Sequence, residues 1–228
     1  DKLEWIKNIE PPNIPVGDAP YEARFDFKGY LLPYTMEYTE ETKVLFHHGE
    51  ESHRPGYTLN ELFQLSRSTV IQQRSLALGT IAGILEYNSL GIYSRVIDIP
   101  ITKTFFVLRF ALDENIQTVL EPSLRALRNM LYNRVDETCL DNCLGTENGL
   151  FQPRILSNQM EADEPETDVT ELKDFHLADL DLISGAIRTD ILPRIRYILF
   201  VIKPSYLCLE YSLQILIRIA RDSIENVQ

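Results

Sequence analysis

Apolar residues recur at helical spacing through most of the chain after Tyr57, and in some segments they cover more than one face. One stripe follows steps of four, three and four residues, at Leu120, Leu124, Leu127 and Leu131. The segment Leu207–Ala220 repeats these steps and is apolar on most sides, which predicts a buried helix. Helices with two apolar faces need neighbours on both. The pattern therefore predicts a mainly α fold, an irregular α-solenoid with armadillo-like or HEAT-like layers, although no fixed sequence period is present.

Two short motifs predict where helices begin. In a capping box, a Ser or Thr is followed three residues later by Glu or Gln, and both side chains bond free N–H groups of the first turn. Thr58–Glu61 and Thr69–Gln72 have this form. A third helix is predicted to begin near Asp113. The second motif predicts a long helix that stops near Asn88 or Gly91 and contains Ala77, Leu78, Ile81, Ile84 and Leu85.

The first 57 residues differ from the rest in their prolines, each of which blocks helix propagation. Six of the twelve prolines lie here, at Pro11, Pro12, Pro15, Pro20, Pro33 and Pro55. Residues Ala23–Lys28 alternate between apolar and charged, which predicts a strand that ends at Gly29. Lys43–Phe46 is the predicted partner strand. We therefore expect residues 1–57 to form an extended, proline-rich arm that contains a short β segment.

The remainder of the chain divides at an acidic stretch. Between Glu161 and Asp174 there are seven acidic residues and one lysine. Such a stretch cannot bury enough apolar surface to offset the entropy of ordering its backbone. We therefore expect a flexible linker at 157–173. It would join a helical section at 58–156 to a second helical section at 174–228 that packs on the same domain.

The acidic balance of the chain restricts its function. The formal net charge is −12 and the isoelectric point is near 4.8. An acidic chain is a poor match for a phosphate backbone, so we expect no direct nucleic-acid binding. The run Ile195–Ile202 is strongly apolar, but Arg194, Arg196 and Lys203 interrupt it well short of the ~20 residues that span a bilayer. It is therefore predicted to be core, and no membrane contact is expected.

The cysteines and the absence of glycosylation sites indicate the compartment in which such a chain occurs, and the first residue indicates whether the chain is part of a longer protein. Three cysteines are too few for a disulfide framework, and no Asn-x-Ser/Thr glycosylation site occurs, as in an intracellular protein. Cys139 and Cys143 are predicted to be buried free thiols, and Cys208 is predicted to lie in the core. The chain begins at Asp1 without an initiator Met, and we expect it to be a piece of a longer protein.

The segment His47–His53 holds three of the four histidines among carboxylates. Imidazole and carboxylate together are a zinc or non-haem iron ligand set, so a metal-dependent enzyme is one hypothesis, with His47, His48, Glu50 and His53 as ligands. The spacing fits no standard site, because adjacent histidines point in different directions on a strand or a helix. The alternative hypothesis is a turn or contact surface without metal. No catalytic nucleophile motif is present.

The segment Arg188–Arg221 is locally basic. It holds six cationic residues and only two acids, Asp190 and Glu210. One interpretation is a solvated rim on buried helices. The other is a docking surface for an acidic partner, with the acidic stretch of this chain itself as one candidate. A third hypothesis, nucleic-acid binding through this segment, conflicts with the net charge.

Ordered sequence blocks along almost the whole chain resemble the conserved carboxy-terminal-type domain of the RNA polymerase II-associated protein 1 family. The blocks begin with Lys2–Trp5 and continue through Ala23–Gly29, His47–Glu51, Pro55–Phe63, Leu65–Ser68, Gln72–Leu78, Leu108–Asp113, Leu124–Arg128, Leu192–Tyr197 and Ile217–Arg221. The resemblance identifies family-signature or partner-contact residues at Arg24, Phe25, Phe27, Gly29, His47, His48, Gly49, Glu50, Tyr57, Arg67, Arg74, Arg194 and Arg196.

This resemblance implies a non-enzymatic interaction scaffold, with no catalytic residue, no metal and no cofactor. The family is associated with assembly and nuclear import of RNA polymerase II and with transcription. The partners implied are polymerase subunits or assembly factors, and Mediator. The locations implied are the nucleus and the cytoplasm. Family members are much longer than this chain, so the resemblance covers a fragment of the family's function.

Overall fold

A computed structural model describes residues 22–34, 36, 38–39, 42–46, 54–93, 96–148, 173–223 and 226. Within these ranges the chain is mainly helical, as the sequence predicts. The elements, in chain order, are β1 (Arg24–Phe25), η2 (Lys43–Leu45, a 3₁₀ helix), β2 (Tyr57–Thr58), α1 (Leu59–Leu65), α2 (Ile71–Ser89), α3 (Ile101–Ala111), α4 (Gln117–Leu131), α5 (Arg134–Asn148), α6 (Asp174–Leu180), α7 (Leu182–Arg188), α8 (Ile191–Tyr197), η3 (Ile198–Ile202, a π-helix) and α9 (Tyr206–Asp222).

Helix α2 is the centre of the amino-terminal half. It packs against α1 on one side and α4 on the other, and its predicted apolar residues are buried: Ala77, Leu78, Ile81, Ile84 and Leu85. The long helix predicted here is confirmed. Its predicted cap is wrong, because the helix begins after Val70 and no side chain caps it. In α1 the predicted capping box is present: Thr58 Oγ1 accepts from Glu61 N at 3.2 Å, and Glu61 Oε2 accepts from Thr58 N at 2.8 Å.

The strand predicted around Phe25 is present, but its predicted partner is wrong. Strand β1 pairs antiparallel with β2, and Lys43–Leu45 forms the 3₁₀ helix η2 instead. Two arginines hold the paired segments together. Arg24 donates to the Gly56 carbonyl oxygen at 3.1 Å, and Arg54 donates to the Glu22 carbonyl oxygen at 2.7 Å. Both Arg24 and Phe25 are therefore buried, so the apolar–charged alternation does not separate a core face from a solvent face.

The turn after β1 lies directly on the backbone of α2. Gly29 has φ +88°, and a Cβ there would come within 2.6 Å of the Gly83 carbonyl carbon. A Cβ on Gly83 would in turn overlap the Lys28 carbonyl oxygen. Polar contacts hold this position: Tyr93 donates its hydroxyl to the Gly29 carbonyl oxygen at 2.6 Å, and Thr80 donates to Phe27 at 3.2 Å. Two facing glycines thus allow the arm and the helix to touch through their main chains.

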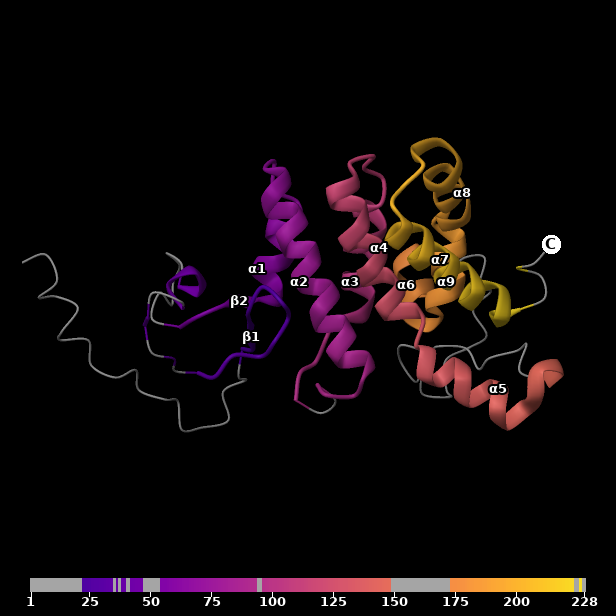
Figure 1. Ribbon diagram of the computed structural model, residues 1–228, viewed down its shortest axis with the longest axis horizontal. Helices are drawn as coiled ribbons and strands as arrows, with labels where there is room; N and C mark the ends of the chain where they lie inside the picture. Colours follow the sequence, from indigo (N-terminus) through magenta and orange to yellow (C-terminus); the bar gives the residue numbers. More distant parts are fainter. Residues whose placement is uncertain are drawn as a thin grey trace, which may run out of the picture.

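Apart from α5, which lies below the row, the helices follow one another along the long axis of the molecule in chain order, with α1 and α2 first, then α3 and α4, then α6 to α9 (Figure 1). Helix α4 packs on both α2 and α9 and so connects the two ends of the core. The helix expected from Asp113 begins at Gln117, after a turn. Helices α3 and α5 were not predicted, because Ile101–Ala111 is rich in β-branched and aromatic residues and α5 is polar on most sides.

Two predictions of burial in the carboxy-terminal half are wrong. In α9 the buried side consists of Cys208, Ser212, Ile215, Arg218 and Ile219, whereas the predicted leucine stripe faces outward, with Leu209 and Leu213 exposed. In the run predicted as core, Ile195 and Ile198 are buried, but Phe200 is 74% exposed and Val201 59% exposed. Among the described residues, no helix combines the length and the hydrophobicity that crossing a membrane requires.

Two of the three cysteines can be compared with their predicted burial. Cys208 is buried, as predicted, whereas the prediction that Cys139 is buried is wrong, because this residue is exposed on α5. The burial of Cys143 stays a prediction, because its side chain lies outside the described part of the structure. The acidic stretch predicted as a linker lies outside the described residues, apart from Lys173 and Asp174, with which α6 begins. The proposed division of the chain into four sections stays a prediction.

The facing glycines generate a test of the fold. We expect Gly83→Ala to lower the free energy of unfolding by about 1–3 kcal/mol, because the new methyl group overlaps the Lys28 carbonyl oxygen. Gly79→Ala, in the same helix, meets no atom within 4 Å and should raise stability by about 0.5–1 kcal/mol through helix propensity. Urea unfolding followed by circular dichroism measures both. Equal effects of the two substitutions would contradict the main-chain contact.

Candidate protein-interaction grooves

A groove of about 680 Å³, here called the α2 groove, lies between the arm, α2 and α4. One face of α2 forms its floor, because residues four apart lie on the same side of a helix. The arm and α4 form its walls. The lining residues are Phe27, Lys28, Ile71, Gln72, Ser75, Leu76, Gly79, Tyr87, Thr118 and Arg125.

The floor of the α2 groove is open and partly apolar. Ile71 is 38% exposed and Leu76 is 45% exposed, whereas the opposite side of α2 is buried. Gly79 leaves empty space above the helix, with no atom within 4 Å of where a Cβ would stand. Ser75 donates its hydroxyl to the Thr118 carbonyl oxygen at 2.8 Å and so joins the floor to the α4 wall. The groove can therefore receive an apolar side chain of another protein.

Cations stand on the two walls of the α2 groove. Lys28 is exposed on the arm, and Arg125 on α4 forms an ion pair with Glu86 at 2.5 Å. A side-chain hydrogen bond with Tyr30 raises the pKa of the Tyr87 hydroxyl to about 12. The rings of Tyr30 and Tyr87 also stack, with centroids 4.8 Å apart. The groove thus offers an apolar floor beside an exposed ammonium group.

A second groove of about 720 Å³, here called the α8 groove, lies on α8 and η3. In Figure 1, α8 is on the other side of α3 and α4 from α2. All of its lining residues come from one continuous helical stretch, α8 followed by η3. They are Leu192, Pro193, Arg196, Tyr197, Phe200 and Val201. The spacing of these residues places them along one side of the helix, and all of the six except Arg196 are apolar or aromatic.

Several of the residues that the resemblance identifies lie inside the fold. Arg24 and Phe25 are buried, and the Phe25 ring meets the Tyr93 ring edge-on at 6.0 Å. Gly29 is buried against α2. Phe27 and Tyr57 are half-buried, with ring centroids 5.5 Å apart, and burial raises the pKa of the Tyr57 hydroxyl. These side chains set the position of the arm, and among them Phe27 also lines the α2 groove.

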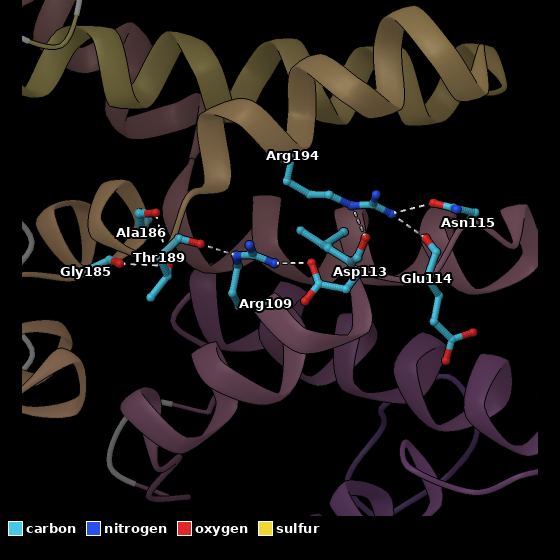
Figure 2. Close-up of polar contacts among 9 residues, drawn as sticks. Arg109, Asp113, Glu114, Asn115, Gly185, Ala186, Thr189 and Arg194 are labelled. Carbon is cyan, nitrogen blue, oxygen red and sulfur yellow. Dashed lines mark hydrogen bonds and ion pairs between the residues drawn. The ribbon is translucent and has the colours of Figure 1, made fainter.

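Arg74 and Arg194 have their guanidinium groups in hydrogen bonds between elements. Arg74 donates to the Ser68 carbonyl oxygen at 2.6 Å and to Glu114 at 2.9 Å. Arg194 reaches from α8 to the connection between α3 and α4, where Nε donates to the Leu112 carbonyl oxygen at 2.5 Å and Nη2 to that of Glu114 at 2.7 Å (Figure 2). Burial lowers the pKa of Arg194.

Arg109 makes the reciprocal connection from the α3 side. Its Nε donates to the Thr189 carbonyl oxygen at 2.7 Å, and its Nη1 donates to Asp113 at 2.6 Å (Figure 2). Thr189 donates its own hydroxyl back to the Gly185 carbonyl oxygen at 2.8 Å. Arg109 therefore joins α3 to the segment between α7 and α8, and Arg194 joins α8 to the connection between α3 and α4.

The remaining residues of the resemblance are exposed or lie outside the described ranges. Arg67 is exposed between α1 and α2, and Arg196 is exposed in the α8 groove. His47, His48, Gly49, Glu50 and His53 lie outside the described residues, so the metal hypothesis stays a prediction. Within the described ranges, no group of three or more His, Cys, Asp or Glu side chains is placed to hold a metal ion.

Sequence reasoning did not find most of the residues that line the α2 groove. Gly79 and Gly83 carried the one available signal, because two glycines four apart in a helix indicate that something approaches that face closely. The outward-facing Ile71 and Leu76 looked like ordinary members of the helical apolar pattern. Arg125 lies one residue after Leu124 of the leucine stripe of α4 and lines the groove.

The sequence of this chain is similar to those of several known proteins. Residues 22–88 match the family model described as "RPAP1-like, C-terminal". The chain is 34% identical to human RNA polymerase II-associated protein 1 and 33% identical to the Bos taurus protein, in each case over 99% of this chain and 18% of the relative. It is 37% identical to Saccharomyces cerevisiae RNA polymerase II-associated protein RBA50 over 37% of this chain and 20% of that protein. No solved structure gives a match.

The relatives named here are all described as RNA polymerase II-associated proteins. This chain matches a fragment of the RNA polymerase II-associated protein 1 family, as the sequence blocks predicted. The fragment spans about a fifth of the length of the mammalian relatives. The family model covers the arm from residue 22 onward, with β1, β2, α1 and nearly all of α2, the elements that form the floor and one wall of the α2 groove.

Arg194 and Arg196 are two residues apart and provide a matched pair of substitutions. We expect Arg194→Gln to lower the free energy of unfolding by about 1–3 kcal/mol, because it removes the donors to Leu112 and Glu114. Arg196→Gln should change it by less than about 0.5 kcal/mol, because that side chain is exposed. Chemical denaturation measures both. A larger loss of stability from Arg196→Gln than from Arg194→Gln would contradict the conclusion that Arg194 stabilises the fold and Arg196 is a surface residue.

Proposed function

We propose that the chain is part of a protein-interaction scaffold that binds RNA polymerase II or the factors that assemble it. The α2 groove is the observation that carries this proposal. Eight of its ten lining residues fall within residues 22–88, which match the family model. The relatives are named for their association with RNA polymerase II. Because the region that matches the family model supplies most of the α2 groove, we propose that RNA polymerase II or its assembly factors bind there.

The scaffold we propose is non-enzymatic and needs no cofactor. Its helices, which follow one another in a row, are consistent with an armadillo-like α-solenoid, in which each layer leaves an edge for partners. By resemblance to the family, we extend the proposal to polymerase assembly, nuclear import and transcription. Contact with Mediator and residence in both nucleus and cytoplasm belong to the same proposal.

A substitution series at Gly79 tests the groove without disturbing the core. In Gly79→Gln a longer side chain fills the open space over the floor, and Gln is a better helix former than Gly. We expect it to weaken retention of purified RNA polymerase II by the immobilised chain by about tenfold, a loss of ~1.4 kcal/mol. Gly79→Ala adds one methyl group to the same position and should retain most of the binding.

The readout is the amount of polymerase retained at equal amounts of folded protein, with helicity checked by circular dichroism. Lys28→Glu provides an independent variant on the arm wall, since it reverses the exposed charge without removing an internal contact. If both Gly79→Gln and Lys28→Glu bind polymerase as well as the original chain does, the α2 groove is not the contact surface.

A further inference from the structure

The basic segment Arg188–Arg221 separates into cations that hold the fold and cations that face solvent. Arg188 pairs with Asp174 at 2.9 Å, Arg218 lies 3.6 Å from Asp222, and Arg221 bonds Glu137 and Asp141. Arg194 is held by the carbonyl groups shown in Figure 2. Within the described residues, Arg196 and Lys203 have no ion pair, and both are exposed.

These two cations border an exposed apolar surface in the carboxy-terminal half of the described fold. Arg196 lines the α8 groove, and Lys203 directly follows the π-helix that carries Phe200 and Val201. Phe200 is 74% exposed, Val201 59% and Tyr197 41%. Exposed aromatic and apolar side chains gathered beside charge are typical of protein-interaction sites, where a large aromatic residue anchors the contact.

The backbone at this site is unusual in two ways. π-Helical turns are rare and occur often at functional sites, and here one spans Ile198–Ile202. Lys203 then adopts φ +55°, a left-handed conformation that a lysine rarely takes. This geometry ends the helix after Ile202, so Lys203 stands at the carboxy-terminal end of the helical stretch that lines the α8 groove.

From these observations we propose that the α8 groove binds an amphipathic acidic helix of a partner protein. The apolar face of that helix would pack on Phe200, Val201 and Tyr197. Its carboxylates would pair with Arg196 and Lys203, whose charges no acid of the described fold neutralises. This inference goes beyond the proposed function, because it concerns a different surface and does not depend on the α2 groove.

Charge decides between this partner and the two other macromolecules that bind basic apolar surfaces. The chain carries a net charge of −12, so an anionic membrane or a nucleic acid would meet long-range repulsion outside this small patch. A peptide helix is small enough to interact with the patch alone. Because the groove is shallow and has only two cations, we expect micromolar affinity that weakens with added salt.

The test uses a fluorescent synthetic helix of about 16 residues, with Leu and Phe on one face and Glu on the other. Fluorescence anisotropy at low salt measures its binding to the chain. We expect Arg196→Glu and Phe200→Ala each to weaken binding by about tenfold or more. Both side chains are exposed, so neither substitution should unfold the protein. Arg67→Glu makes the same charge change on the exposed α1–α2 connection and should have little effect.

A second peptide, with Lys in place of every Glu, completes the design. It should bind the original chain weakly and the Arg196→Glu variant more tightly. The proposal is overturned if the chain binds neither peptide, if it prefers the Lys peptide, or if Arg196→Glu and Phe200→Ala leave binding unchanged. It is also overturned if the chain binds phosphatidylserine vesicles through Phe200 more tightly than the acidic peptide. Gly79→Gln should not alter peptide binding, which separates this test from that of the polymerase contact.

Discussion

The contact between the turn after β1 and the middle of α2 determines how the amino-terminal half is arranged. Lys28 and Gly29 meet Gly83 and Ile84 through main-chain atoms, with no side chain between them. This distance brings Tyr93 into hydrogen-bonding range of Gly29 and Leu31, and it places Phe27 beside α2. The arm thereby becomes one wall of the α2 groove. The groove is a consequence of two residues that lack side chains, since any Cβ would push the wall away from its floor.

The fold class and the main helices could be predicted from local patterns, because helical spacing and capping depend on residues a few positions apart. The leucine stripe of α4 and the capping box of α1 are such cases. Tertiary relations could not be predicted in the same way. The alternation at Phe25 indicates a strand but not its partner, which lies 32 residues away. In α9, leucines and isoleucines occupy every side, so spacing alone could not distinguish the buried face from the exposed one.

The candidate sites were harder to predict than the fold, because each depends on where a side chain ends. The arginines that the family resemblance identifies fall into two groups. Arg24, Arg74 and Arg194 donate hydrogen bonds to carbonyl oxygens within the structure. Arg67 and Arg196 are exposed to solvent. Sequence blocks do not separate these two groups. The α2 groove combines residues of the arm, α2 and α4, and only the folded chain brings them together. For the same reason, the number of cations in the segment Arg188–Arg221 is larger than the number that another protein can contact, because most of these side chains are held in contacts within the fold.

The hydrogen bonds of Arg109 and Arg194 join residues about 80 positions apart, and those of Arg221 to α5 do the same. These contacts attach α7, α8 and α9 directly to the helices that precede residue 149. The free energy of closing an interval of chain grows only with the logarithm of its length, by about 0.6 kcal/mol for each doubling. A change in the number of residues between 149 and 172 should therefore cost little free energy, because the contacts between the helices on either side do not depend on that number.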